Sequence, residues 1–365
     1  MGRGMITRKS VCAISAAGLV AAACAGPGPA APEGPDYVTL ERSGVSVTIT
    51  PDFGGRLVRF GLAGRDSLVL FDADLAAEQP APPVDVSSSA LPYQGQSLWL
   101  GPQDEWWTHQ SVLPEMQGQG WPPDPYLTAA KTQMSQAAYT VTLQGPPSPY
   151  SGVKVRQTYE LLESGCLKLT SEAENTRSEQ VAWDLWTNIR VPGDTWVFAP
   201  VAGADAIRPG ATNDPSFTPP VVSHAGGLAY ANPSMEGVTA PAREGKVFLD
   251  PAAGWMAGVR AGQAFRVSFP LRAKDEIHPA QGQVEFYFNQ PHGNAGAGVI
   301  EMETHAPYLT LAPGETMRAV QYWSAQPVAE DALSPARLGP LAEEIAAQDP
   351  CSFALPKWRE WQATD

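Results

Sequence analysis

Residues 153–161 read VKVRQTYEL, and residues 45–50 read VSVTIT. In both stretches apolar and polar side chains alternate with a period of two. Successive side chains of a β-strand point to opposite faces of a sheet, so this period is typical of strands that bury one face. Both stretches therefore predict half-buried strands.

The same pattern continues along most of the chain. Further strands are expected at residues 56–62, 67–71, 138–144, 166–174, 181–191, 246–250, 255–260, 264–270, 284–289, 298–304 and 315–324. The chain contains 36 Pro and 34 Gly, which end strands and form turns. Many short strands separated by such turns favour an all-β fold, a large twisted antiparallel β-sandwich. One short C-terminal helix is expected, with Ser334 as its cap, Pro335 as its first residue and Leu341 to Ala347 continuing it.

The N-terminus has the pattern of an export signal. Arg3, Arg8 and Lys9 precede an uncharged apolar run that ends before Cys24 and is too short for a stable membrane anchor. The run ends in Val20-Ala21-Ala22-Ala23, which resembles a lipobox. This predicts a signal peptide at residues 1–23 and a lipid on Cys24; ordinary cleavage after the small residues is the alternative. The expected location is the bacterial cell envelope, with the lipid in the membrane and the protein facing the periplasm or exterior.

Composition divides the rest of the chain. Residues 24–36 are rich in Pro, Gly and Ala and predict an extended tether. A β-sandwich domain is expected at residues 37–330, and a C-terminal helix and tail at residues 331–365. The net charge is −14, so nucleic acid is not an expected partner.

Two cysteines remain in the part expected to fold. In an oxidising compartment Cys166 and Cys351 either form one bridge or remain two separately buried thiols, and the sequence leaves both open. The chain has no CxxC pair and no Cys/His cluster, so no metal site is expected. Residues 293–298 (GNAGAG) lack the helix that follows a phosphate-binding loop, and no cofactor is expected.

Tryptophan is concentrated in residues 76–130. Trp99, Trp106, Trp107 and Trp121 lie among Gln, Asp and Glu residues. Indole rings pack on the C–H faces of sugars, and neighbouring amides and carboxylates bind hydroxyl groups, so this segment favours a carbohydrate cleft. The alternative is that the indoles pin a long loop to the sandwich.

Two predicted strands carry polar side chains on one face. In residues 299–305 the alternation places Glu301, Glu303 and His305 together. Two carboxylates one pleat apart raise the pKa of one of them, which is a property of general acids and bases. In residues 181–190 the shared face carries Asp184, Trp186, Asn188 and Arg190. Solvated strand faces are the alternative for both.

Several short motifs occur in a recognisable order. They are Pro51-Asp52-Phe53-Gly54-Gly55-Arg56-Leu57, Leu98-Trp99-Leu100-Gly101-Pro102 with Trp121-Pro122-Pro123, and Glu301-Met302-Glu303 with Leu311-Ala312-Pro313-Gly314-Glu315. In this order the chain resembles, over roughly residues 37–325, an uncharacterised family of the galactose mutarotase-like (aldose 1-epimerase-like) superfamily. The resemblance implies a mutarotase-like supersandwich with a sugar-binding concave face.

The resemblance also implies roles for single residues. A late-strand glutamate of such enzymes removes the anomeric hydroxyl proton, and Glu303 or Glu301 is similar to it in position. The usual histidine acid precedes a Tyr-Phe-Asn-Leu run, and the nearest likeness here, Trp186-Thr187-Asn188-Ile189, places Asp184 at that position. No histidine lies on this strand, so Asp184 as the acid would need a raised pKa.

These observations leave three functions open. The first is an envelope-anchored carbohydrate-binding protein, with or without epimerase-type acid/base activity by Glu303 and Asp184. The second is a non-catalytic module that recognises glycan or a partner protein, and the third is a structural lipoprotein. We expect Glu303, Asp184, Trp186, Asn188 and Arg56 to converge on one concave surface, with Trp99, Trp106 or Trp107 forming part of its rim. The residues expected to bind the substrate are Arg56, Trp99, Trp106, Trp107, Trp186, Asn188 and Glu301.

Overall fold

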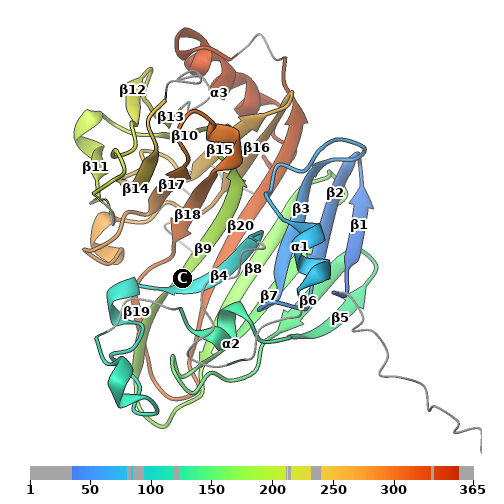
Figure 1. Ribbon diagram of the computed structural model, residues 1–365. Helices are drawn as coiled ribbons and strands as arrows, with labels where there is room; N and C mark the ends of the chain where they lie inside the picture. The colour runs from blue at the N-terminus through green and yellow to red at the C-terminus, as the bar shows by residue number, and fades with distance from the viewer. Residues whose placement is uncertain are drawn as a thin grey trace, which may run out of the picture. The chain divides into compact units, whose positions relative to one another are not determined.

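Two antiparallel β-sheets pack face to face in the computed structural model (Figure 1). The structure describes residues 35–79, 84, 94–118, 123–210, 212, 215–231, 240–329 and 333–352. These residues belong to one unit of the chain, residues 34–365. The predicted signal peptide, Cys24, almost all of the tether and Trp121 lie outside the described residues.

The first sheet has ten strands among the described residues. In spatial order they are β1 (Val38–Arg42), β2 (Val45–Thr50), β3 (Arg56–Leu62), β4 (Gln96–Gly101), β9 (Val181–Pro192), β18 (Val299–His305), β17 (Val284–Gln290), β14 (Arg243–Leu249) and β11 (Ile207–Pro209), with β19 (Leu309–Leu311) beside β9.

The second sheet also has ten strands within the described ranges. Their order is β12 (Ser223–Ala225), β13 (Leu228–Ala231), β10 (Trp196–Pro200), β15 (Trp255–Arg260), β16 (Gln263–Ser268), β20 (Thr316–Pro327), β8 (Leu167–Asn175), β7 (Val153–Leu161), β6 (Thr140–Gln144) and β5 (Gln133–Ala137). The predicted all-β antiparallel sandwich is confirmed.

The alternating strands bury one set of side chains, as the period of two predicts. In β7, Tyr159 and Leu161 are buried while Lys154 and Arg156 are not. The inward faces of both sheets form one apolar core, whose largest members include Phe60, Phe286 and Trp323. Burial of this apolar area is the main driving force for sheet packing.

Three α-helices accompany the sheets in the described part of the chain. They are α1 (Ala73–Glu78), α2 (Pro125–Thr128) and α3 (Leu338–Ala347). The expected C-terminal helix is α3, which packs Leu338, Leu341 and Ile345 on apolar residues of β10 and β15 (Figure 1). Its start differs from the prediction, because Pro335–Arg337 form a 3₁₀ turn before α3 and Ser334 makes no side-chain cap hydrogen bond.

One predicted strand is absent, and another starts later than predicted. Residues 67–71 are not a strand, since the Ser67 hydroxyl bonds to the backbone of Val69 and only Phe71 forms an isolated bridge, to Gln94. The strand expected at 138–144 starts later, because Ala138, at a φ of 44°, lies in the turn between β5 and β6. Local turn geometry therefore overrides the hydrophobic pattern at both places.

A disulfide joins Cys166, just before β8, to Cys351, just after α3. The Cα atoms are 5.2 Å apart, so of the two alternatives that the sequence left open, the single bridge is the one that forms. The bridge ties the C-terminal segment to the second sheet. Within the described ranges, no helix has the length and apolar character needed to cross a membrane.

Candidate carbohydrate site

The outward face of the first sheet carries a row of polar side chains opposite the core. Register places Glu301 opposite Arg190, Glu303 opposite Asn188, and His305 opposite Trp186. The neighbouring strand pairs Glu285 with Glu303. Strand parity then puts all these side chains on one face, because opposed residues in an antiparallel pair point the same way.

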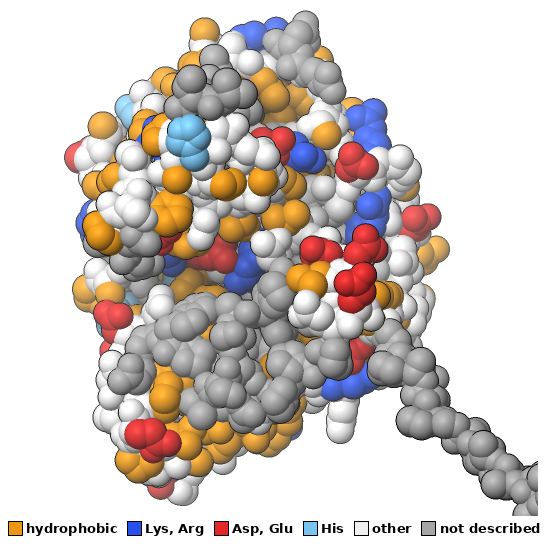
Figure 2. Space-filling view, viewed as in Figure 1, with side chains coloured by type: hydrophobic (Ala, Val, Ile, Leu, Met, Phe, Trp, Pro, Cys, Tyr) orange, Lys and Arg blue, Asp and Glu red, His pale blue; other side chains and the backbone are white. Residues whose placement is uncertain are grey.

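A cavity of about 790 Å³ opens on this face. Figure 2 shows the middle of the molecule hollowed, with acidic and basic side chains gathered in the hollow. The lining residues come from β3, β4, β9, β14, β17 and β18 and from several segments outside the strands, and they include Arg56, Gln94, Ser97, Trp99, Gln103, Asp104, Trp186, Arg190, Lys246, Gln281, Glu285, Tyr287 and Glu301. The volume lies within the range of small-molecule sites.

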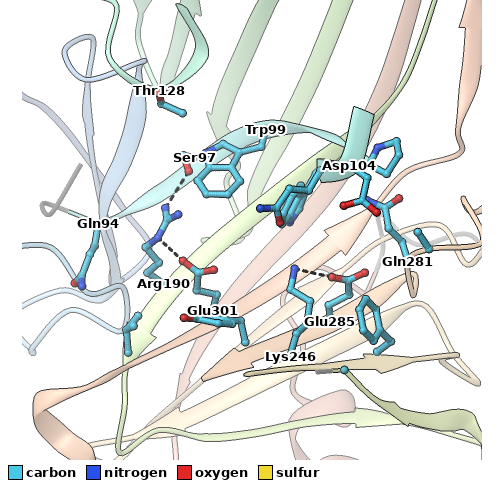
Figure 3. Close-up of a pocket in the computed structure, with 18 of the residues that line it drawn as sticks. Gln94, Ser97, Trp99, Asp104, Thr128, Arg190, Lys246, Gln281, Glu285 and Glu301 are labelled. Atoms are coloured by element: carbon cyan, nitrogen blue, oxygen red, sulfur yellow. Dashed lines mark hydrogen bonds and ion pairs between the residues drawn. The ribbon is translucent and has the colours of Figure 1, made fainter. Parts of the chain in front are cut away.

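Paired charges form one side of the cavity (Figure 3). Arg190 Nε donates to Glu301 Oε1 at 2.8 Å, and Arg190 Nη1 donates to the Ser97 hydroxyl at 3.0 Å. Beside them, Lys246 Nζ lies 2.8 Å from Glu285 Oε2 and 2.6 Å from Glu303 Oε2. Each cation at this wall therefore has a carboxylate partner.

The network continues beneath the wall. His305 Nδ1 lies 3.1 Å from Asp184 Oδ1, and its Nε2 lies 3.4 Å from Glu285 Oε1. Burial alone would lower the pKa of His305, but the carboxylates of Glu285 and Asp184 outweigh it and raise the pKa to about 10. His305 is therefore a cation at neutral pH.

The carboxyl groups respond differently to this environment. Burial, together with the nearby Glu301 and Glu285, raises the pKa of Glu303 well above its usual range, although Lys246 opposes this shift. For Glu285, burial also favours the neutral form, but Lys246 and His305 outweigh it and lower the pKa. Glu303 is thus the carboxyl group that most readily holds a proton.

The same groups include a candidate cation site. Ligand atoms of Glu285, Glu303 and His305 all lie within 4.8 Å of one another. The ammonium of Lys246 already lies between the two carboxylates, and it supplies the positive charge that a metal ion would bring.

Of the residues predicted for the site, Arg56, Trp99, Trp186 and Glu301 line the cavity. Arg56 does so in a structural role, because its guanidinium donates to the carbonyls of Phe53, Gln94 and Thr128 at 2.6 to 2.8 Å. It joins three separate segments, and these bonds occupy donors that would otherwise bind a ligand.

The predicted tryptophans differ in whether they line the cavity. Arg190 lies over the ring of Trp99 at 5.2 Å, and Lys246 lies over the ring of Trp186 at 4.4 Å. Trp106 stacks with Trp186 and donates its N–H to Leu100, but it does not line the cavity. Trp107 is fully buried against Tyr150 and pins the loop to the sandwich, so Trp99 is the one of the three rim candidates that lines the cavity.

Three further predicted residues lie behind the wall. Asn188 is buried and donates to both Glu301 and Glu303, so it positions these side chains. Glu303 lies beneath Lys246 and does not line the cavity. Asp184 is covered by β4, where a Cβ added to Gly101 would lie 2.5 Å from its Oδ2. Asn188, Glu303 and Asp184 therefore do not line the cavity in this structure.

Several cavity residues were missed by the sequence prediction. Lys246 alternates with buried Val247 on β14, and Glu285 alternates with buried Val284 and Phe286 on β17. This parity was available in the sequence. Gln281 comes from a loop with no such signal, and only the folded chain brings it to the cavity.

One carboxylate fastens the loops beside the cavity. Glu105, next to the cavity residue Asp104, accepts hydrogen bonds from Tyr308 at 2.8 Å and from His109 at 3.0 Å. Its other oxygen lies 3.6 Å from His278, on the loop that carries Gln281. These contacts fix the positions of the two loops relative to each other.

The sequence matches one family of protein domains. Residues 36–326 match the model of a family described as Domain of unknown function (DUF4380). The chain belongs to this family. No curated protein matches the sequence of this DUF4380 chain.

Solved structures share the fold of the DUF4380 domain. A galactose mutarotase-like protein from Lactobacillus casei has a TM-score of 0.52 at 11% identity, over 80% of this chain and 100% of that one. A putative aldose 1-epimerase from Klebsiella pneumoniae has a TM-score of 0.52 at 13% identity, over 86% and 84%. A GalM/aldose epimerase homologue from C. elegans has a TM-score of 0.52 at 12% identity, over 81% and 100%. The fold is therefore the galactose mutarotase-like β-sandwich, and identities this low establish the fold alone.

Proposed function

We propose that this protein binds a carbohydrate in the 790 Å³ cavity and does so at the bacterial cell envelope. The observation that carries the proposal is the polar wall of this cavity. Its charged groups pair with one another, while amides of Gln94, Gln103 and Gln281 lie beside them. Such a wall offers many donors and acceptors for hydroxyl groups without demanding a charged ligand.

The indoles of Trp99 and Trp186 form part of this wall. Lys246 lies over the ring of Trp186, and Trp106 stacks on that ring at a separation of 5.9 Å. The Nε1 donor of Trp186 is buried and has no hydrogen-bond partner among the described residues. Because that nitrogen is buried, Trp186 contributes apolar wall to the cavity rather than a hydrogen bond to a ligand.

Binding without turnover is the favoured form of the function. A general base must come within hydrogen-bond reach of the proton that it removes. Lys246 separates Glu303 from the cavity, and β4 covers Asp184. Neither predicted catalytic group meets this condition in the present arrangement.

Epimerase-type proton transfer is the second candidate, and the position of Glu301 favours it. Glu301 lines the cavity, and Asn188 donates to both Glu301 and Glu303. A displacement of Lys246 would join Glu303, with its raised pKa, to the same cavity.

A sugar library screened by thermal shift tests binding, because a ligand of the native state raises its apparent stability. For the best sugar, Trp186→Phe should weaken affinity roughly 5- to 10-fold, because Phe removes part of the indole from the cavity wall and with it about 1 kcal/mol of apolar contact. Trp255→Phe, on β15 and away from the cavity, is the matched control. The proposal fails if no sugar binds, or if both substitutions have the same effect.

Anomer exchange measured by NMR separates the two forms of the function. With the sugar that binds, pure binding predicts no exchange above the uncatalysed rate. Epimerase activity predicts exchange that Glu303→Gln or Glu301→Gln abolishes while sugar binding persists, because the amide keeps the shape and removes the proton acceptor.

The envelope location rests on two independent observations. The N-terminal residues 1–24 resemble a lipoprotein signal. The Cys166–Cys351 bridge is the kind of bond that forms and persists in oxidising compartments, which supports export.

A further inference from the structure

The carbohydrate cavity extends across the strands of the first sheet rather than along one of them. Its lining residues belong to strands that are adjacent in the sheet, in the order β3, β4, β9, β18, β17 and β14. Neighbouring strands lie about 4.8 Å apart, so the five spacings between these strands cover about 24 Å along the sheet. In Figure 3, Gln94 and Gln281 lie at opposite sides of the cavity, with Glu301 and Lys246 between them. A pyranose ring is roughly as wide as one strand spacing, so the cavity is long enough for several rings.

Aromatic side chains form two separate groups along this cavity. Trp99 of β4 and Trp186 of β9 form the first group, with ring centroids 5.0 Å apart. Tyr287 of β17 and Phe248 of β14 form the second group, and both are half-buried. The strand β18, which contributes Glu301, lies between the two groups. Because β4 and β14 are four spacings apart, about 19 Å along the sheet, one sugar ring cannot contact both ends of this aromatic row.

Neighbouring residues hold the ring of Phe248 in position. The guanidinium of Arg208, on β11, lies over this ring at 4.2 Å. The chain just after β11 also packs on it, since a Cβ added to Gly210 would lie 3.0 Å from Phe248 Cε2. A side chain that is already held loses little conformational freedom when a ligand binds to it. Phe248 therefore suits a binding surface for the C–H face of a sugar ring.

The charged residues of the cavity balance one another. Among the described residues, three basic and three acidic side chains line it, and they are Arg56, Arg190, Lys246, Asp104, Glu285 and Glu301. A polymer with one charge on every sugar unit would meet both signs along its length, and like charges repel. A chain of neutral sugar units avoids this repulsion and still finds hydrogen-bond donors and acceptors all along the wall.

We propose that the cavity binds a chain of several neutral sugar units that lies across the strands. One unit contacts the rings of Trp99 and Trp186, and another contacts those of Tyr287 and Phe248. This inference rests on the proposed carbohydrate function and names its ligand class. Each further unit adds contacts, while the loss of translational and rotational freedom occurs only once for the whole chain. An internal unit has no free anomeric hydroxyl, so an extended ligand agrees with binding without turnover.

Calorimetric titration of the full chain carrying Cys24→Ser compares monosaccharides with linear tetrasaccharides built from them. The probes are glucose with cellotetraose and maltotetraose, N-acetylglucosamine with chitotetraose, mannose with mannotetraose, and galactose with galactotetraose. At least one tetrasaccharide should bind about 10-fold or more tightly than its monosaccharide. If every sugar that binds does so as tightly in its monosaccharide form, the extended-ligand inference fails while the carbohydrate function stands. If no probe of either length binds, both fail.

A variant of the second aromatic group locates the further sugar unit. Phe248→Ala should lower the ratio of tetrasaccharide affinity to monosaccharide affinity about fivefold or more, because it removes a ring that only the longer ligand reaches. The matched control is Tyr322→Ala, which removes a half-buried aromatic ring from β20 of the second sheet and should leave this ratio unchanged. An unchanged ratio in the Phe248→Ala variant would refute the assignment of a sugar unit to this end of the cavity.

Discussion

Lys246 Nζ lies 2.6 Å from Glu303 Oε2, and this contact separates the predicted catalytic carboxyl group from the cavity. The lysine also reaches Glu285 at 2.8 Å. Lys246 thus pairs with two buried carboxyl groups, and its position determines whether Glu303 can contact a ligand in the cavity.

Replacing Lys246 should destabilise the protein strongly. Lys246→Met leaves two buried carboxyl groups without their shared cation, and breaking a buried pair costs about 3–5 kcal/mol. Denaturant unfolding at neutral pH measures the loss. Lys274→Met is the control, because the Lys274 side chain is 81% exposed and exposed pairs contribute at most about 1 kcal/mol. Equal losses in both variants would contradict the network described here.

His305 should make stability depend on alkaline pH. Its pKa, raised to about 10 by Glu285 and Asp184 against the effect of burial, exceeds the unfolded value. Such a group stabilises the fold fully below its unfolded pKa of about 6.5, and the contribution is lost as the pH rises through the folded pKa. Between pH 7 and pH 10, wild type should lose roughly 1 kcal/mol per pH unit relative to His305→Gln. Parallel unfolding free energies over this range would count against a charged His305.

Replacing Arg56 should lower stability more than it lowers sugar binding. Arg56→Ala removes the partner of three backbone carbonyls, and unsatisfied buried acceptors cost about 1–3 kcal/mol each before relaxation. A loss of about 3 kcal/mol is expected by denaturant unfolding. Arg65→Ala, which removes an exposed side chain with one carbonyl contact, should cost less than about 1 kcal/mol. If Arg56→Ala weakens sugar binding without loss of stability, Arg56 binds the ligand directly, as the sequence analysis expected.

The disulfide should contribute measurably to stability. The Cys166–Cys351 bridge spans 185 residues, and removal of a native bridge costs about 2–5 kcal/mol. The double variant Cys166→Ala/Cys351→Ala should melt at a lower temperature than oxidised wild type. Reduction of wild type should reproduce this shift and should leave the melting of the double variant unchanged. A reductant effect of equal size in both proteins would assign the change to something other than this bridge.

Cys24 should determine membrane attachment. Cys24→Ser removes the thiol that the lipid would modify, and the protein should move from the membrane fraction to the soluble fraction of cells. Detergent phase separation measures this for both proteins. Lipid anchoring would be excluded if wild type from cells already partitioned into the aqueous phase.

Sequence patterns predicted much of the polar face. Alternation placed Asp184, Trp186 and Asn188 together on one strand, and Glu301 with Glu303 on another. These predictions succeed because side-chain direction in a strand depends only on position along that strand. Trp106 and Trp107, which do not line the cavity, lie on a loop, where no periodicity indicates side-chain direction.

By itself, the sequence determined the all-β class, the buried face of alternating strands such as β7, and the residues that share the opposite face of β9 and β18. Only the tertiary structure decided which strands lie side by side. It brought Lys246 from β14 to Glu303 of β18, and it placed Asp184 under Gly101 of β4. Local periodicity carries no information on strand order or cross-strand register, because these depend on how both sheets bury their apolar faces together. That packing, rather than any motif, decides which predicted residues reach the cavity.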